Sequence, residues 1–318
     1  MREYTSKIAP LMQEFEQYRL APGRWSENCN LHLSLFDGHC ASSCADVEVP
    51  AQEMLDAWRS QRETEANNSC RFRICAVVSF VRYLRKRGMT DVRIPIIPRK
   101  EARTYIPHAF SEMELCSFFD ACDSIANYSK TEGQISRRLA VPVFFRLLHS
   151  SGIRANEARM LRQNDVSLVN GVLNIEHSKG RGRHFIAVRE SMLKLMRDCD
   201  RAIAKMHPNR LHFFPARDGK RRTKQWAPVN FKKMWGKNNS SRAVPYEFRH
   251  NYAIENINRW TDDGFGFHQK LRTLGKSMGR SAVESAKYCY SLVPRLADVL
   301  AEHANEDEAI PEACYESC

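Results

Sequence analysis

The stretch SGIRANEARML, residues 151–161, gives the strongest single indication of the fold of this chain. Gly152 predicts a turn that places Arg154 at the start of a helix. An arginine at such a position can donate two parallel hydrogen bonds to a phosphate group. Arg154 and Glu157 are also spaced for an ordinary ion pair within one helix, so this stretch taken alone favours that simpler interpretation.

A predicted β-hairpin follows this stretch. Two short β-like runs, 171–176 and 184–188, flank the glycine-rich turn SKGRGR, which is a pattern typical of a hairpin. The turn offers Lys179, and its glycines would let the backbone approach another surface closely.

Two further elements come after the hairpin. In PYEFRH, Tyr246 and Arg249 lie one helical turn apart on the same face of a predicted helix. The stretch LGKSMGRSAVESAKYCYSLV, residues 274–293, then carries two tyrosines, Tyr288 and Tyr290, on either side of Cys289.

Taken in this order, the elements resemble the catalytic domain of tyrosine recombinases, the phage integrase family. That family has an arginine in G-[LI]-R-x-x-E-x-x-x-L, a lysine on a β-hairpin, H-x-x-R, and G-H-S-x-x-x-T-T-x-x-Y. Arg154, Lys179 and Arg249 match the two arginines and the hairpin lysine. The resemblance covers roughly residues 105–295, and the helical first hundred residues look like the core-binding domain of the family.

Three positions depart from the family pattern. Tyr246 stands at the histidine of H-x-x-R, and a tyrosine with a pKa near 10 is a poor proton acceptor at neutral pH. Arg280 stands at the histidine of G-H-S; it can donate a hydrogen bond but cannot act as a base. Superposing Gly279-Arg280-Ser281 on G-H-S places Cys289 at the nucleophile position.

The resemblance implies cofactor-free strand exchange on double-stranded DNA. A tyrosine would attack the scissile phosphate and form a 3′-phosphotyrosyl bond. Arg154 and Arg249 would bind the phosphate oxygens, and Lys179 would protonate the leaving 5′-oxygen. Tyr246 and Arg280 would hydrogen-bond the phosphate.

The nucleophile stays open among several alternatives. Tyr288 or Tyr290 would serve if the last helix shifts by one residue, which turns a side chain by about 100°. Cys289 could attack as a thiolate. The protein could also be a catalytically impaired recombinase that binds attachment-site DNA without cleavage.

Charge supports a polyanionic partner. The net charge is +12, and the residues from Leu296 onward contain seven carboxylates and no lysine or arginine, so the basic excess lies in the first 295 residues. A body this basic typically binds nucleic acid. The resemblance implies duplex DNA as that partner, self-association into a tetramer on synapsed DNA, and a role in a phage or another mobile element.

The sequence gives no indication of a membrane, metal or cofactor partner. No apolar run reaches the roughly 20 residues that span a bilayer, and the N-terminus lacks a signal-peptide pattern, so we expect a cytoplasmic protein. Eleven cysteines, an odd number, do not imply disulfides. The five Cys and His residues between 29 and 44 invite a zinc interpretation, but they lack the C-x-x-C spacing of structural zinc sites.

We expect a mainly α (α+β) fold with one small antiparallel sheet. The predicted domains are a helical core-binding domain at 1–92, a basic linker with three prolines at 93–108, a catalytic domain at 109–303 and an acidic tail at 304–318. Predicted helices cover residues 7–20, 51–62, 69–87, 111–124, 134–150, 191–205, 229–236, 245–259, 269–278 and from 281 onward.

Overall fold

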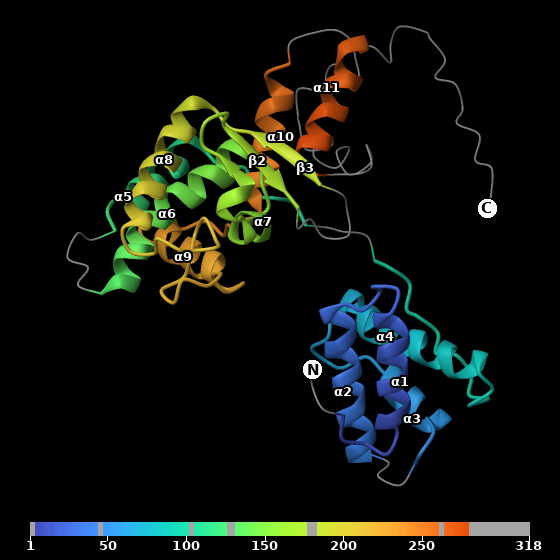
Figure 1. Ribbon diagram of the computed structural model, residues 1–318. Coiled ribbons are helices and arrows are strands. Elements are labelled where there is room, and N and C mark those ends of the chain that lie inside the picture. The colour runs from blue at the N-terminus through green and yellow to red at the C-terminus, as the bar shows by residue number, and fades with distance from the viewer. Residues whose placement is uncertain are drawn as a thin grey trace, which may run out of the picture. The chain divides into compact units, whose positions relative to one another are not determined.

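The computed structural model describes residues 4–43, 47–101, 105–125, 131–176, 183–260 and 264–279. The chain divides into two compact units, Met1–Tyr105 and Ile106–Cys318 (Figure 1). Most described residues are helical and the described strands form one small antiparallel sheet, so the predicted fold class is confirmed. The assignment of functions to the predicted domains stays a prediction.

The described part of the first unit is built from helices around α4. Its core holds apolar residues of all four helices. Helix α4 lies at the centre of this core because its apolar residues repeat at helical spacing; Val77, Phe80, Val81 and Leu84 are all buried. The helices are α1 (Ala9–Leu20), α2 (Glu27–Ser43), α3 (Gln52–Arg59) and α4 (Asn67–Lys86).

The first part of the predicted linker packs along α4. Ile94 and Ile97 lie against a small apolar cluster of α4. Arg71 Nη1 donates a hydrogen bond of 2.7 Å to the carbonyl of Pro98. The boundary between the two units falls after these contacts, between Tyr105 and Ile106.

The second unit surrounds helix α6 with helices and a three-stranded sheet of order β1-β2-β3 (Figure 1). The strands β2 and β3 pair antiparallel, with Ile175 opposite His184, as the predicted hairpin requires. The turn that joins them lies outside the described residues. The elements are α5 (Glu112–Asp123), α6 (Glu132–Ser151), α7 (Ala155–Met160), β1 (Val166–Ser167), β2 (Val172–Ile175), β3 (His184–Ala187), α8 (Glu190–Ala204), α9 (Trp226–Trp235), α10 (Glu247–Asn258) and α11 (Gly264–Ser277).

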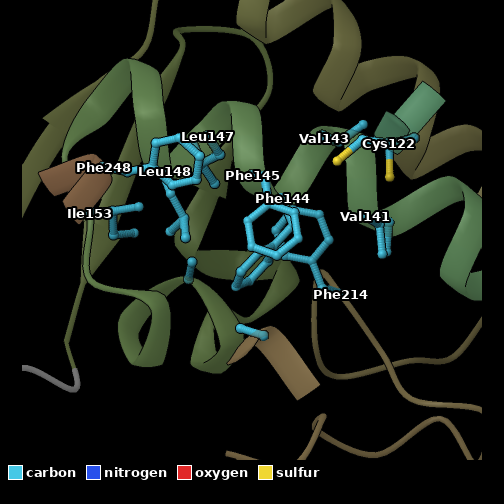
Figure 2. Packing of buried hydrophobic residues seen from close by; sticks show 14 of the residues in the cluster. Cys122, Val141, Val143, Phe144, Phe145, Leu147, Leu148, Ile153, Phe214 and Phe248 are labelled. Carbon is cyan, nitrogen blue, oxygen red and sulfur yellow. The ribbon is translucent and has the colours of Figure 1, made fainter. Parts of the chain in front are cut away.

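An aromatic core anchors the elements that carry the site. Phe144 and Phe145 of α6 and Phe248 of α10 are fully buried in one cluster (Figure 2). The Phe248 ring centroid lies 5.6 Å from that of Phe118 and 5.7 Å from that of Phe231. Such aromatic pairs add to the free energy of apolar burial, so α10 is firmly fixed beside α6.

The described residues contain neither a metal cluster nor a membrane helix. No group of three or more His, Cys, Asp or Glu side chains among them could hold a metal ion. Among the described helices, none combines the length and hydropathy needed to span a bilayer. Cys29, His32, His39 and Cys40 all lie on α2.

Candidate functional site

The turn between α6 and α7 positions Arg154. Gly152 ends α6 in the left-handed conformation, with φ +63°, and its N–H donates to the carbonyl of Leu148 at 3.0 Å. A Cβ on Gly152 would lie 2.4 Å from Cδ1 of Tyr252, so only glycine permits this close approach to α10. Arg154 then stands directly before the first residue of α7, where the sequence predicted it.

The buried carboxylate of Glu157 fixes Arg154. It accepts a hydrogen bond of 3.1 Å from the Arg154 backbone N–H and a second from Arg154 Nη1. The Arg154 side chain is partly exposed, and its Nη2 donates to the carbonyl of Gly279 at 3.2 Å. One end of the guanidinium is thus paired with a carboxylate, and the other reaches the turn that follows α11.

Arg249 of α10 reaches the same turn from another direction. Its side chain is only 1% exposed. Nη1 donates to the carbonyl of Gly152 at 2.6 Å, and Nη2 donates to the carbonyl of Met278. The two arginines therefore meet at the adjacent carbonyls of Met278 and Gly279, although they are far apart in the sequence.

The N-terminus of α10 is fixed by Glu247. Its buried carboxylate accepts the N–H of Val244 at 2.7 Å and that of His108 at 3.1 Å. Tyr246 precedes this helix and is 48% exposed; its ring meets the His250 ring edge-on, with centroids 5.1 Å apart. About half of the Tyr246 surface is therefore accessible to solvent beside the start of α10.

A histidine that sequence reasoning missed completes the cluster. His184 begins β3, is 8% exposed, and packs against Gly279, where a Cβ would lie 2.6 Å from the His184 Cε1 atom. Burial lowers the pKa of His184; the charge of Glu157 opposes this shift, and the charges of Arg154 and Arg249 add to it. The ring is therefore neutral at neutral pH.

The structure brings together part of the predicted site. Arg154 and Arg249 meet, and Tyr246 lies at the surface where α10 begins. The remaining predicted site residues, Lys179, Arg280, Tyr288, Cys289 and Tyr290, lie outside the described residues.

Sequence comparison identifies relatives of this chain. The phage integrase family model matches residues 113–264. A protein of Sinorhizobium fredii described as an integrase/recombinase is 27% identical over 205 residues, which cover 62% of this chain and 64% of that protein. This chain therefore spans less than two thirds of the length of that relative.

Solved structures share the fold. The XerH site-specific recombinase bound to a palindromic difH substrate has a TM-score of 0.60 and 14% identity, covering 87% of this chain and 79% of that one. The Tn1549 transposon integrase in complex with transposon right end DNA has a TM-score of 0.64 and 12% identity, covering 94% and 99%. A lambda integrase tetramer on a Holliday junction has a TM-score of 0.60 and 11% identity, covering 88% and 76%. With the motif order and the family match over residues 113–264, these likenesses show that the chain shares the fold of tyrosine recombinases and is similar to the phage integrase family.

Proposed function

We propose that this protein is a site-specific recombinase that cuts and rejoins duplex DNA through a covalent 3′-phosphotyrosyl intermediate. The observation that carries the proposal is the meeting of Arg154 and Arg249 at the turn formed by Met278 and Gly279. Two arginines from separate helices, one backed by the buried Glu157, form a cationic pair suited to a single phosphate.

The scissile phosphate would take over hydrogen bonds that the two guanidinium groups now give to backbone carbonyls. Charge-assisted hydrogen bonds to a phosphate are roughly twice as strong as those to a neutral carbonyl. Donors held in place before the reaction also stabilise the negative charge that develops in the transition state. Arg154 and Arg249 would bind the non-bridging oxygens, with Tyr246 and Arg280 adding hydrogen bonds to the phosphate.

Strand cleavage would then pass through a tyrosine. The hydroxyl of Tyr288 or Tyr290 attacks phosphorus, the bond to the 5′-oxygen breaks, and Lys179 protonates that oxygen. The free 5′-hydroxyl of another strand reverses the step and rejoins the DNA. The phosphotyrosyl bond retains the reactivity of the cleaved bond, so no cofactor is required.

The partners of the protein are duplex DNA and further copies of this chain. The lambda integrase relative is a tetramer on a Holliday junction, and the XerH and Tn1549 proteins are complexes with DNA. By the same arrangement, four copies of this chain would synapse two recombination sites of a phage or another mobile element.

A nicked suicide substrate tests the proposal. Duplexes that bind the protein are first selected from a random pool, and nicks are then placed at successive positions near the centre of the bound site. At the correct position the short 5′-hydroxyl fragment diffuses away, so a covalent protein–DNA adduct accumulates. Tight binding without an adduct at any nick position would refute cleavage.

Single substitutions then identify the nucleophile. Tyr288→Phe or Tyr290→Phe should abolish the adduct, and the other variant serves as the matched control. If neither changes the adduct, the attacking group is elsewhere and Cys289 becomes the candidate.

The second candidate function is a recombinase-like protein that binds attachment-site DNA without cleavage. The replacements at Tyr246, Arg280 and Cys289 favour it, because each removes a group on which the reaction in this family depends. Under this alternative, the protein as it stands forms no adduct, and Cys289→Tyr creates one. Adduct formation by the unaltered protein would exclude it.

A further inference from the structure

A cavity of about 760 Å³ lies at the C-terminal end of α7. Met160, the last residue of α7, lines it together with Arg162, whereas Arg154 stands before the first residue of the same helix. Neither Arg154 nor Arg249 belongs to its lining. Small-molecule sites typically have volumes of about 300–1,000 Å³, so the cavity is large enough for a ligand of metabolite size.

Backbone hydrogen bonds fix the walls of this cavity. Arg162 and His212 pair antiparallel, and the N–H of Gln163 donates to the carbonyl of Leu211 at 3.0 Å. In the turn at residues 216–221, the first N–H donates to the carbonyl four residues further on at 2.7 Å. Two separate segments of hydrogen-bonded backbone therefore bound the cavity and keep its side chains apart.

Three cations of the lining have no carboxylate partner in the described part of the chain. Arg162 and Lys220 form no side-chain hydrogen bond or ion pair there, and Arg221 donates only to the sulfur of Met160, at 3.8 Å. Burial lowers the pKa of His212, and the charges of Arg162 and Arg221 lower it further, so both guanidinium groups act on the same ring.

Negative charge at the cavity does not balance these cations. Asp218 supplies the single carboxylate of the lining, and its Oδ1 accepts the backbone N–H of Lys220 at 3.1 Å. A fourth cation of the lining, the buried Arg210, is already paired with Asp200. An excess of positive charge in a concave site attracts an anion that carries several charges.

The same cavity also offers apolar surface. Met160, Met206 and Leu211 line it, and Leu211 is 57% exposed. Methionine side chains are flexible and polarisable and make favourable contacts with aromatic rings. An arginine guanidinium also stacks on a flat ring. A ligand with an aromatic part and several negative charges would use both kinds of surface.

A DNA duplex fits this combination poorly. A duplex is a convex rod that keeps the faces of its bases stacked inside, and it presents mainly phosphates and base edges. Its backbone would touch only the mouth of a cavity and leave the apolar side chains in water. A free nucleotide, in contrast, exposes both a flat base and a chain of phosphates.

We propose that this cavity binds a nucleoside polyphosphate such as ATP. Its phosphates contact the three unpaired cations, because arginine binds phosphate oxygens through parallel hydrogen bonds and lysine binds them as a point charge. Its base covers the apolar side chains of the lining. The cavity shares no residue with the site of the scissile phosphate, so this inference stands whether or not the protein cleaves DNA.

Isothermal titration calorimetry of the whole chain with ATP, in the absence of DNA, tests the proposal. We expect saturable binding of one ATP per chain. Arg221→Ala should weaken this binding by about 10–100-fold, because it removes charge-assisted hydrogen bonds. Arg217→Ala is the matched control and should keep the affinity: Arg217 is an exposed cation of the same turn, but it does not line the cavity and its side chain lies against Gly133 of α6.

Two further titrations separate the base from the phosphates. Tripolyphosphate carries the negative charges without the base, so it should bind more weakly than ATP. Leu211→Ala should weaken ATP binding and leave the affinity for tripolyphosphate unchanged, because the base covers the Leu211 side chain. Circular dichroism checks that each variant is folded. Equal affinities for tripolyphosphate and ATP would overturn the nucleotide assignment and leave only an anion site.

Other results would also overturn the proposal. These are an absence of saturable ATP binding to the unaltered protein, and equal losses in Arg221→Ala and Arg217→Ala, which would indicate a general attraction of a basic protein to anions. Displacement of ATP by duplex DNA, with a loss of duplex affinity in Arg221→Ala alone, would assign the cavity to the DNA interface. If the variants do not fold, photolabelling of the unaltered protein with 8-azido-ATP decides: label on peptides from residues 206–221 supports the site, and label elsewhere overturns it.

Discussion

Replacing Gly152 by alanine should destabilise the second unit more than an ordinary glycine substitution would. Gly152 has φ +63°, a conformation that costs an L-residue about 1–2 kcal/mol. The added Cβ would also lie 2.4 Å from Cδ1 and 3.0 Å from Cγ of Tyr252, and such overpacking costs about 1–3 kcal/mol. The expected loss in the free energy of unfolding is therefore about 2–5 kcal/mol.

Gly219→Ala separates the two contributions. Gly219 has φ +74° in the same unit, but a Cβ added there would lie 4.0 Å from its nearest neighbouring atom, Nδ1 of His207. It should lose only the backbone contribution of about 1–2 kcal/mol. In a unit of this size, about 1 kcal/mol lowers Tm by about 2–4 °C, so calorimetry resolves the difference.

A double-mutant cycle identifies the steric partner. In a Tyr252→Ala background, Gly152→Ala should lose only the backbone contribution, because the clashing ring is absent. Gly152→Ala should also slow DNA cleavage, since the Gly152 carbonyl accepts from Arg249. Equal Tm shifts for Gly152→Ala and Gly219→Ala would refute the close approach of the turn to α10.

Three further outcomes follow from the site and its charges. Glu157→Gln removes the negative charge that holds Arg154, so the free energy of unfolding in urea should fall by about 1–3 kcal/mol. The same variant should slow adduct formation more than it weakens DNA binding. An equal loss in the adduct rate and in DNA affinity would count against a fixed Arg154. Burial lowers the pKa of His149, His184 and His212, so below about pH 6.5 the unfolded chain binds more protons than the folded one. The free energy of unfolding should therefore fall between about pH 6.5 and pH 5, and a flat profile of urea midpoints would contradict this. DNA affinity should fall steeply with added salt as phosphate contacts release counterions, and a salt-independent affinity in filter binding would argue against duplex DNA as the ligand.

Much of the fold could be predicted from apolar spacing, and α4 illustrates why. Its apolar residues recur every three to four positions, and most of them are buried in the structure, whereas Phe72 is exposed. Helix α2 was not delimited within the helical first hundred residues, and its Leu31, Leu33 and Leu35 alternate as in a strand. Only Leu33 of these is buried, together with Phe36 at helical spacing.

Long-range contacts explain what sequence reasoning could not supply at α2. The side chain of Asp37 is buried because it accepts hydrogen bonds from the backbone and hydroxyl groups of Thr5 and Ser6, more than thirty residues away. No sequence pattern near Asp37 indicates these distant partners. A charged residue at a buried position therefore interrupts the apolar periodicity of α2 in the sequence.

The residues of the candidate site, like the helices, could be predicted from the sequence only in part. Arg154, Glu157 and Arg249 could be identified from the sequence because they belong to motifs that follow one another in the order and spacing of the resembled family. His184 was not, because its relevance depends on Gly279, which lies almost a hundred residues further along the chain. A single histidine at the start of a short strand has no motif of its own, and only the unpaired nitrogens of its buried ring mark it.

Mapping the covalent bond formed on a nicked suicide substrate tests the central claim most directly. The trapped adduct is digested with protease and nuclease, and mass spectrometry locates the nucleotide on its peptide. We expect a 3′-phosphate linked to Tyr288 or Tyr290, and the linkage should disappear in Arg154→Ala while DNA binding remains. An adduct that forms undiminished in Arg154→Ala, or cleaved DNA that carries a free 3′-phosphate and no protein, would contradict it.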